Sequence, residues 1–245
     1  MKHRAAIIGC GRMGVGGAGW EFPYVYTHAD AYLALKDRVE LVALCDTDKQ
    51  RGVEAAKRLG LIGCYSDVST MLDEVKPDIV SVCTPNGTHQ AVMRAVTEAA
   101  SVKGVWLEKP CELTVAPSIP VQVNYCRRFC RVHRYVATII HDLKAHLYVW
   151  ARRDWTTVVH FADLARMMNI PPDRIHYTDN TGEYPSTNSY RIEAGKWAFD
   201  FRNGGCEGGF METALTELLD GPLAISSPAD YAIESEILAR QLMEA

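Results

Sequence analysis

Residues 5–14 read Ala-Ala-Ile-Ile-Gly-Cys-Gly-Arg-Met-Gly, an apolar run that leads directly into the pattern G-x-G-x-x-G. A short apolar strand, this turn and a following helix form the phosphate-binding unit of dinucleotide-binding folds. Gly9 permits the tight turn, Gly11 lets a pyrophosphate approach the backbone, and Gly14 lets helix and strand pack closely. The helix N-terminus would offer unpaired N–H groups to the anion. The stretch predicts a dinucleotide site; the alternative is a structural turn rich in glycine.

An acidic residue supports the dinucleotide interpretation. Asp46 directly follows the apolar run 39–45, where its carboxylate can accept hydrogen bonds from the adenosine ribose hydroxyls. The same charge would repel a 2′-phosphate, so NAD is favoured over NADP. Asp46 follows Gly14 by 32 residues, whereas compact versions have about 20, and the excess lies in residues 15–26. The aromatic cluster within residues 20–26 could form a wall of the cleft or cover the base of a hydrophobic loop.

The first half of the chain alternates apolar runs with helical patterns, which is typical of a parallel sheet covered on both faces. We predict strands at 5–8, 39–45, 64–65, 79–83 and 105–108, and helices at 28–36, 48–59, 68–75 and 89–100. This alternation indicates βαβ units, and therefore a doubly wound dinucleotide-binding (Rossmann) domain over residues 1–120.

The pattern changes after Pro110. Prolines at 117 and 120 disfavour a helix within residues 111–120, although a crossover between parallel strands usually contains one. Further along, we predict strands at 121–125, 146–152, 174–178, 190–194 and 196–202, and helices at 131–143, 158–168, 211–219 and 230–243. The last two strands meet at Ala194-Gly195, which suggests an antiparallel hairpin. We expect a smaller second domain over 121–245, whose final helices could pack back on the first.

Composition excludes several classes of protein. The 245 residues are 48% hydrophobic and 23% charged, with a net charge of −4, as in ordinary globular proteins and unlike nucleic-acid-binding ones. No apolar run is long enough to span a bilayer, and the N-terminus does not resemble a signal peptide. Eight cysteines are scattered along the chain, and no spacing indicates a metal site. We expect reduced thiols and a cytoplasmic protein.

Two further motifs carry a family resemblance. Thr84-Pro85-Asn86-x-x-His89 follows the predicted fourth strand, and Glu108-Lys109-Pro110 follows the fifth. Together with the glycine turn, they resemble the Gfo/Idh/MocA oxidoreductases. Tyr125-x-Arg127-Arg128-Phe129 is similar to that family's Asn-Arg-Arg-Phe strand end, and His160-x-x-Asp163 to its H-x-x-D element. The resemblance is strong over residues 1–130 and weaker beyond them.

The resemblance implies a fold, an activity and a set of residues. The second domain would contain an open, mostly antiparallel sheet, and the protein would transfer a hydride between NAD and a hydroxyl-bearing carbon of a sugar, sugar derivative or cyclitol. Lys109 would bind substrate and assist proton transfer, His160 would be the acid/base with Asp163 behind it, and Arg127 would contact substrate or cofactor. The implied cofactor-binding residues are Gly9, Gly11, Arg12, Met13, Gly14, Asp46, Thr84, Pro85, Asn86, His89, Glu108 and Lys109.

The resemblance also implies a homo-oligomer, a dimer or tetramer formed through the second sheet. An apolar surface for that contact could come from aromatic residues of the second domain, although burial against the domain's own helices is an equal alternative for half of them. These residues are Trp150, Trp155, Tyr190, Trp197, Phe199 and Phe201.

Several residues depart from the family pattern. Thr156 stands where members with a catalytic histidine have an aspartate, four residues before His160, and Cys126 replaces the usual asparagine. Asp154 could reach in from a loop, or the relay could have lost a member. These departures keep a second hypothesis open, a non-catalytic NAD(P)-binding regulator or pseudoenzyme on the same scaffold. A third is reduction of a non-sugar substrate such as an imine or a tetrapyrrole.

Overall fold

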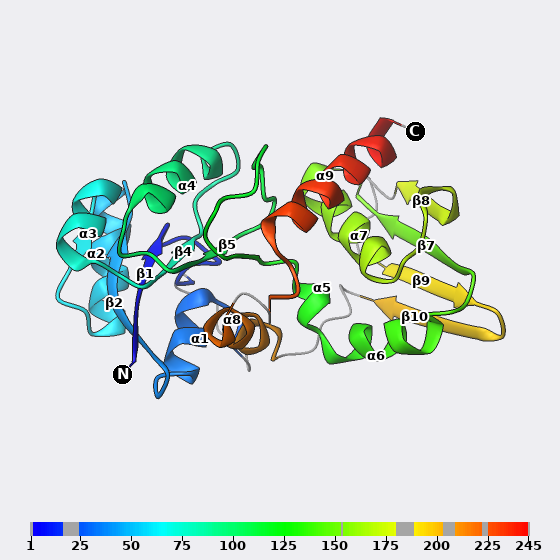
Figure 1. Ribbon diagram of the computed structural model, residues 1–245, viewed down its shortest axis with the longest axis horizontal. Coiled ribbons are helices and arrows are strands. Elements are labelled where there is room, and N and C mark those ends of the chain that lie inside the picture. Colours follow the sequence, from blue (N-terminus) through cyan, green and yellow to red (C-terminus); the bar gives the residue numbers. More distant parts are fainter. Residues whose placement is uncertain are drawn as a thin grey trace. The chain divides into compact units, whose positions relative to one another are not determined.

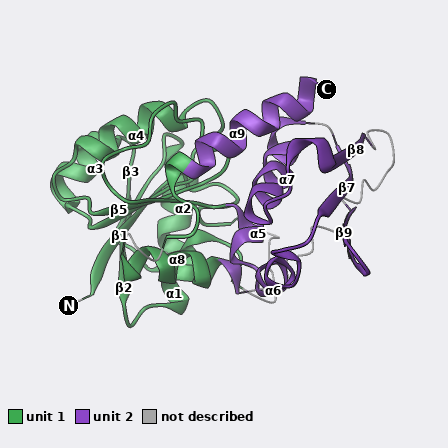
Figure 2. Ribbon diagram, turned by 45° about the vertical axis from the view of Figure 1, so that its right-hand side comes forward, with its two compact units in different colours: residues 1–124, 211–230 green, residues 125–210, 231–245 purple. Residues whose placement is uncertain are grey.

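The computed structural model describes residues 2–16, 25–152, 154–179, 189–202, 209–221 and 225–244. It divides the chain into two compact units, coloured separately in Figure 2: unit 1 is Met1–Asn124 with Met211–Asp230, and unit 2 is Tyr125–Phe210 with Tyr231–Ala245. The first crossing between the units thus follows Asn124, and residues 211–230 return to unit 1. Most of the aromatic cluster predicted beside the glycine turn, residues 20–24, lies outside the described residues.

Unit 1 contains the predicted parallel sheet. Its strands run in the order β3-β2-β1-β4-β5-β6, and every pair is parallel. This is the doubly wound order, with a switch point between β1 and β4 where ligands bind beyond the carboxyl ends of the strands. The bounds are β1 His3–Ile8, β2 Val39–Cys45, β3 Cys64–Tyr65, β4 Ile79–Val82, β5 Gly104–Leu107 and β6 Val121–Val123.

Helices cover both faces of this sheet, and α1 and α8 lie on one side of the strands with α4 on the other (Figure 1). Asp48 and Asp67 cap α2 and α3 by accepting hydrogen bonds from backbone N–H groups, and Gly60 ends α2 in the left-handed conformation that glycine favours. The bounds are α1 His28–Ala34, α2 Lys49–Leu59, α3 Val68–Val75, α4 His89–Glu98 and α8 Phe210–Asp220.

The connection between β5 and β6 contains no helix, as the prolines predicted. Helix α8, from much later in the chain, lies against this part of the sheet instead. A Cβ built on Gly104 of β5 would lie 3.2 Å from Cδ1 of Leu218. Gln122 of β6 donates to Glu217 Oε2 at 2.9 Å. The return of residues 211–230 to unit 1 therefore covers the β5–β6 part of the sheet on the face that α1 also covers (Figure 1).

Unit 2 contains a four-stranded sheet in the order β10-β9-β7-β8. The pairs β10–β9 and β7–β9 are antiparallel and β7–β8 is parallel, so the sheet is mostly antiparallel, as expected. The strands are β7 Ala145–Ala151, β8 Ile175–Asp179, β9 Ser189–Ala194 and β10 Trp197–Arg202. The helices are α5 Cys126–Phe129, α6 Arg131–Ile140, α7 Trp155–Met167 and α9 Ala229–Glu244, with a short 3-10 turn at Pro172–Arg174.

The aromatic residues of unit 2 divide between its core and its surface. Tyr190 and Phe201 are buried, whereas Trp150 is 40% exposed and Trp197 46% exposed.

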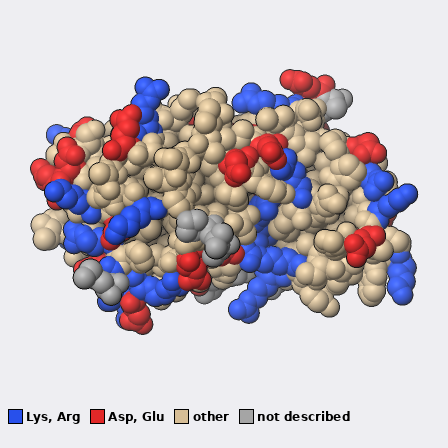
Figure 3. All heavy atoms as spheres, in the orientation of Figure 1, with Lys and Arg blue, Asp and Glu red and all other residues tan. Residues whose placement is uncertain are grey.

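On the face drawn in Figure 3, lysine and arginine side chains lie among aspartate and glutamate side chains. Among the described residues, no helix is both long and apolar enough to cross a membrane.

Candidate active site

The glycine turn connects β1 to the edge of the sheet where the strands end. Gly9 has φ +96°, and a Cβ built there would lie 2.5 Å from the carbonyl oxygen of Cys83. A Cβ on Gly14 would lie 2.0 Å from the carbonyl oxygen of Gly9, whereas one on Gly11 would meet nothing within 4 Å. Gly9 and Gly14 are therefore required by packing. Gly11 is not, and it leaves the space above the turn open.

The hydrogen bonds of the turn leave donors for an anion. The N–H groups of Val15 and Gly16 donate to the carbonyl of Gly11 at 3.0 and 3.1 Å. Within the described ranges, no residue accepts a hydrogen bond from the N–H of Gly11 or of Met13. A turn with open backbone donors at the end of a parallel strand binds phosphate groups.

The helix predicted at 28–36 begins at His28, some distance along the chain from the turn. The N–H groups of His28 and Ala29 donate to the carbonyl oxygens of Met13 and Gly14, each at 2.9 Å. The turn is thus joined to α1 by backbone hydrogen bonds, although 13 residues lie between Gly14 and His28 in the sequence. The extra residues between them account for the long spacing from Gly14 to Asp46.

Asp46 lies at the end of β2, and its carboxylate is held by four donors. The N–H of Cys10 and Nε of Arg51 donate to Oδ2 at 2.7 and 3.0 Å, and the N–H of Asp48 and Nη2 of Arg51 donate to Oδ1, each at 2.9 Å. Burial alone would raise the pKa of Asp46, but Arg51 and the backbone donors hold it below its usual value. Arg51 was not among the predicted site residues, although its place in the first turn of α2 could have indicated it.

A cavity of about 580 Å³ lies along the carboxyl ends of β1, β2, β4 and β5 in unit 1. Ten of the twelve predicted cofactor residues line it: Gly9, Gly11, Arg12, Met13, Asp46, Thr84, Pro85, Asn86, Glu108 and Lys109. Gly14 packs beneath the turn, and the imidazole of His89 is fully buried. Nδ1 of His89 lies 2.7 Å from the carbonyl oxygen of Pro110 and Nε2 lies 2.9 Å from that of Thr84, so this ring joins two strand-end loops.

A buried polar network supports Glu108 and was not predicted. Nε2 of His28 lies 3.1 Å from Oε1 of Glu108, and Nδ1 lies 2.9 Å from Oγ of Ser81. Asn124 donates to the same Oε1, while Oε2 accepts the N–H of Lys109 at 3.2 Å. Glu108 thus connects the first residue of α1 to the backbone of Lys109. His28 was missed because it lies too far along the sequence from the glycine turn to belong to that motif.

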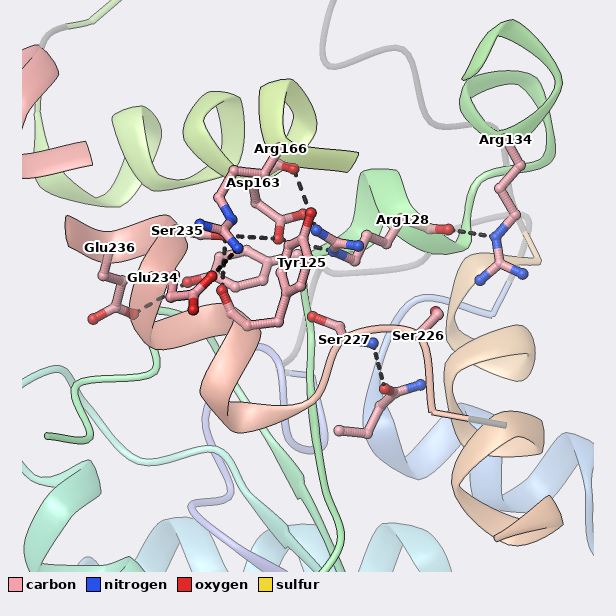
Figure 4. Close-up of polar contacts among 12 residues, drawn as sticks. Tyr125, Arg128, Arg134, Asp163, Arg166, Ser226, Ser227, Glu234, Ser235 and Glu236 are labelled. Atoms are coloured by element: carbon pink, nitrogen blue, oxygen red, sulfur yellow. Dashed lines mark hydrogen bonds and ion pairs between the residues drawn. The ribbon is translucent and has the colours of Figure 1, made fainter. Parts of the chain in front are cut away.

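The predicted residues of unit 2 have other partners there. Figure 4 shows the carboxylate of Asp163 between Arg128 and Ser235. Arg128 Nε donates to Asp163 Oδ1 at 2.8 Å, and Ser235 Oγ donates to the same oxygen at 3.3 Å. Burial alone would lower the pKa of Arg128, but Asp163 raises it above the usual value, so the guanidinium stays charged. Asp163 therefore connects α5, α7 and α9 within unit 2.

Arg127 and His160 lie among aromatic rings. The guanidinium of Arg127 is buried, 4.6 Å from the centroid of the Phe161 ring. The half-buried imidazole of His160 meets the Tyr125 ring edge to face, with centroids 6.1 Å apart. Each arrangement stabilises unit 2, and the predicted contacts of Arg127 and His160 with substrate stay predictions.

The departure at Thr156 has a local explanation. Asp154 is the N-cap of α7, and its Oδ1 accepts hydrogen bonds from the N–H of Thr157 at 3.0 Å and from Thr156 Oγ1 at 2.7 Å. Of the two alternatives, a carboxylate reaching His160 from a loop or a relay without that member, the first would require the Asp154 carboxylate to leave its place at the start of the helix. The hydroxyl of Thr156 thus forms part of the N-cap of α7.

An open glycine turn, an acid at the end of β2 and a cavity at the switch point define a dinucleotide-binding Rossmann domain. Residues 3–123 belong to the Gfo/Idh/MocA family, since they match the model described as "Oxidoreductase family, NAD-binding Rossmann fold". The residues present fit NAD, since a Cβ at Gly11 would occupy the open space above the turn and Asp46 lines the cavity at the end of β2, the position at which a Rossmann fold offers a carboxylate to a ribose.

Curated relatives resemble only part of the chain. The D-glucoside 3-dehydrogenase of Escherichia coli K12 is 35% identical over 111 residues, covering 45% of this chain and 28% of the relative. The scyllo-inositol 2-dehydrogenase (NAD(+)) of Bacillus subtilis is 28% identical over 142 residues, covering 53% and 38%. The matched segments thus span only 28% and 38% of the lengths of these two relatives.

Solved structures share the fold over nearly the whole chain. The WlbA dehydrogenase of Bordetella pertussis, in complex with NADH and UDP-GlcNAcA, matches with a TM-score of 0.75 at 16% identity, covering 98% of this chain and 95% of that one. The scyllo-inositol dehydrogenase of Lactobacillus casei, with bound NAD(H) and scyllo-inositol, matches with a TM-score of 0.70 at 14% identity, covering 100% and 97%.

Proposed function

We propose that the protein is an NAD-dependent oxidoreductase that transfers a hydride between nicotinamide and a hydroxyl-bearing carbon of a sugar, sugar derivative or cyclitol. The observation that carries this proposal is the shared cavity: Lys109 lines the same space as the glycine turn and Asp46. The relatives named as glucoside and inositol dehydrogenases support the substrate class.

Bound NAD supplies the hydride acceptor, and the protein binds and orients it. The turn at Gly9–Gly14 would hold the pyrophosphate with backbone N–H groups, and Asp46 would face the adenosine ribose. Thr84, Pro85 and Asn86 line the cavity beyond β4. The negative charge of Asp46 is the reason that NAD is favoured over NADP.

Lys109 would act on the reacting oxygen of the substrate. The neutral amine can accept the hydroxyl proton, and the ammonium so formed stabilises the negative charge that develops on the oxygen as hydride leaves the carbon. The N–H of Lys109 is bonded to Glu108, which fixes the backbone from which the side chain extends. His160 remains our candidate for the acid/base of unit 2, and Asp163 would support it by anchoring α7 to Arg128.

Two further expectations belong to this proposal. The exposed Trp150 of the second sheet, with Tyr148 stacked beside it, offers an apolar surface for a homo-oligomer. The described cysteines are free thiols, which is consistent with a cytoplasmic protein.

The test is a screen of sugars, sugar acids and cyclitols with NAD, in which NADH formation is followed by absorbance. We expect turnover with at least one member of the panel and loss of that turnover in Lys109→Ala. Lys57→Ala, which removes an exposed lysine from α2, is the matched control. Binding of NAD without turnover across the panel would contradict the proposal and favour a regulator or pseudoenzyme.

A further inference from the structure

The hydrogen bonds that the Asp46 carboxylate already accepts leave few acceptor positions for the hydroxyls of a ribose. A carboxylate offers about four lone-pair positions, and four donors already fill those of Asp46: the N–H groups of Cys10 and Asp48, and Nε and Nη2 of Arg51. The 2′- and 3′-hydroxyls of an adenosine ribose would add two more donors. A ribose can therefore bind Asp46 only if existing donors leave.

Only the donors of Arg51 can leave without unfolding the site. The N–H of Cys10 belongs to the glycine turn, and the N–H of Asp48 belongs to the N-cap of α2. Both are backbone groups fixed by their elements. The side chain of Arg51 is 50% exposed, while that of Asp46 is 5% exposed. Arg51 can therefore swing into solvent and release one lone pair on each oxygen of Asp46.

We propose that Arg51 gates the adenosine end of the cavity and reduces the preference for NAD over NADP that Asp46 sets. It competes with the ribose of NAD for Asp46 and so weakens NAD binding. Once released, its guanidinium can pair with the 2′-phosphate of NADP, because arginine and phosphate form strong charge-assisted hydrogen bonds. The site thereby admits NADP as a second, weaker cofactor. The inference rests on the proposed function, since it assumes that this cavity binds a dinucleotide.

Nearby charges explain why NADP stays the weaker ligand. Nη1 of Arg51 lies 3.7 Å from Oδ2 of Asp48, so Arg51 faces two carboxylates. A 2′-phosphate bound to Arg51 would be close to both Asp46 and Asp48, and like charges repel. Arg51 offsets this repulsion in part, and without it the subsite would present only carboxylates to the phosphate.

Calorimetric titration with NAD and with NADP tests the inference without a substrate. Arg51→Ala removes the side chain that competes with the ribose for Asp46 and that would also pair with the 2′-phosphate. We expect it to bind NAD about threefold more tightly, the size of effect that an exposed ion pair carries, and NADP about tenfold more weakly, as for a lost hydrogen bond to a charged group. Arg51→Lys keeps the charge but not the two-pronged contact, and should retain most of the NADP affinity. Lys57→Ala, the matched control on the same helix, should change neither.

Titration with ADP and with 2′,5′-ADP locates the effect. The two ligands should repeat the opposite shifts in Arg51→Ala, because both shifts arise at the adenosine end. If Arg51→Ala binds NAD less tightly than the wild type, or has the same ratio of NAD to NADP affinity, the proposed role of Arg51 is wrong. The cofactor site itself would still be supported by NAD binding. If the wild-type protein binds neither dinucleotide, the cofactor site and the gate are both wrong.

Discussion

Replacing His28 by leucine removes one partner of the buried pair with Glu108. The imidazole is fully buried, and the Glu108 residue is 5% exposed. In the variant, the carboxylate keeps Asn124 and the N–H of Lys109 but loses its contact with the ring, whose nitrogen lies 3.1 Å from Oε1. The loss of a hydrogen-bond partner by a buried group costs about 1–3 kcal/mol, and more when the group is charged. We expect a loss of about 3 kcal/mol, because the buried carboxylate is charged but Asn124 and Lys109 still hold it.

The pH dependence of this loss has a definite sign. Burial alone would raise the pKa of Glu108, but His28 and then Asn124 hold it below the usual value. A carboxyl group whose pKa is lower in the folded state contributes stability above its unfolded pKa, about 4.3, and this stability is lost as the pH falls through the folded value. The difference between wild type and His28→Leu should therefore be largest near neutral pH and shrink below about pH 4.

Urea unfolding of a double-mutant cycle measures the pair. The cycle comprises the wild type, His28→Leu, Glu108→Gln and the double variant. We expect a coupling of about 2 kcal/mol between the two sites, since glutamine removes the buried charge that leucine leaves unpaired. His141→Leu, at an exposed histidine, is the control and should change stability by less than about 0.5 kcal/mol. Additive effects of His28→Leu and Glu108→Gln, or a loss that is the same at pH 4 and pH 7, would refute the reasoning.

Three further substitutions test other parts of the structure. Gly14→Ala forces a Cβ to 2.0 Å from the Gly9 carbonyl oxygen, and urea unfolding should report a loss of about 1–3 kcal/mol; unchanged stability would contradict this packing. Asp163→Ala leaves the buried Arg128 without its carboxylate and should cost about 3–5 kcal/mol, whereas a loss below about 1 kcal/mol would argue against a structural pair. Lys109→Ala should lower turnover by orders of magnitude while NAD affinity, measured by calorimetry, stays close to that of the wild type; unchanged turnover would remove Lys109 from the mechanism.

Local sequence patterns predicted the parallel sheet and most of the cavity. A parallel strand buried on both faces needs a continuous apolar run, so the runs at 39–45 and 79–83 were visible without knowledge of their neighbours. Gly9 and Asp46 were predicted because each follows directly after such a strand, and Lys109 because Glu108-Lys109-Pro110, which follows the fifth strand, resembles a family motif. The carboxyl ends of parallel strands meet at one edge of a sheet, and this brings the three residues to the same cavity.

Contacts between distant residues could not be predicted in this way. His28 and Glu108 are 80 positions apart, and nothing near either residue in the sequence specifies the other. Asp163 follows His160 by one helical turn, so helical spacing and the family resemblance both suggested that it would support His160. Its partner Arg128 lies on a different helix. Helix α8 was predicted as a helix, but its amphipathic pattern does not identify the sheet that it covers.

The most direct test of the dinucleotide cavity is NADH binding to Gly11→Val, measured by calorimetry beside the wild type and Gly63→Val. A Cβ at Gly11 or at Gly63 meets nothing within 4 Å, and neither residue has a positive φ, so both variants should fold. Only Gly11 lines the cavity, where valine would occupy the space of the pyrophosphate. We expect the wild type and Gly63→Val to bind NADH equally and Gly11→Val to show no binding. NADH binding by Gly11→Val with wild-type affinity would contradict the proposed cofactor site.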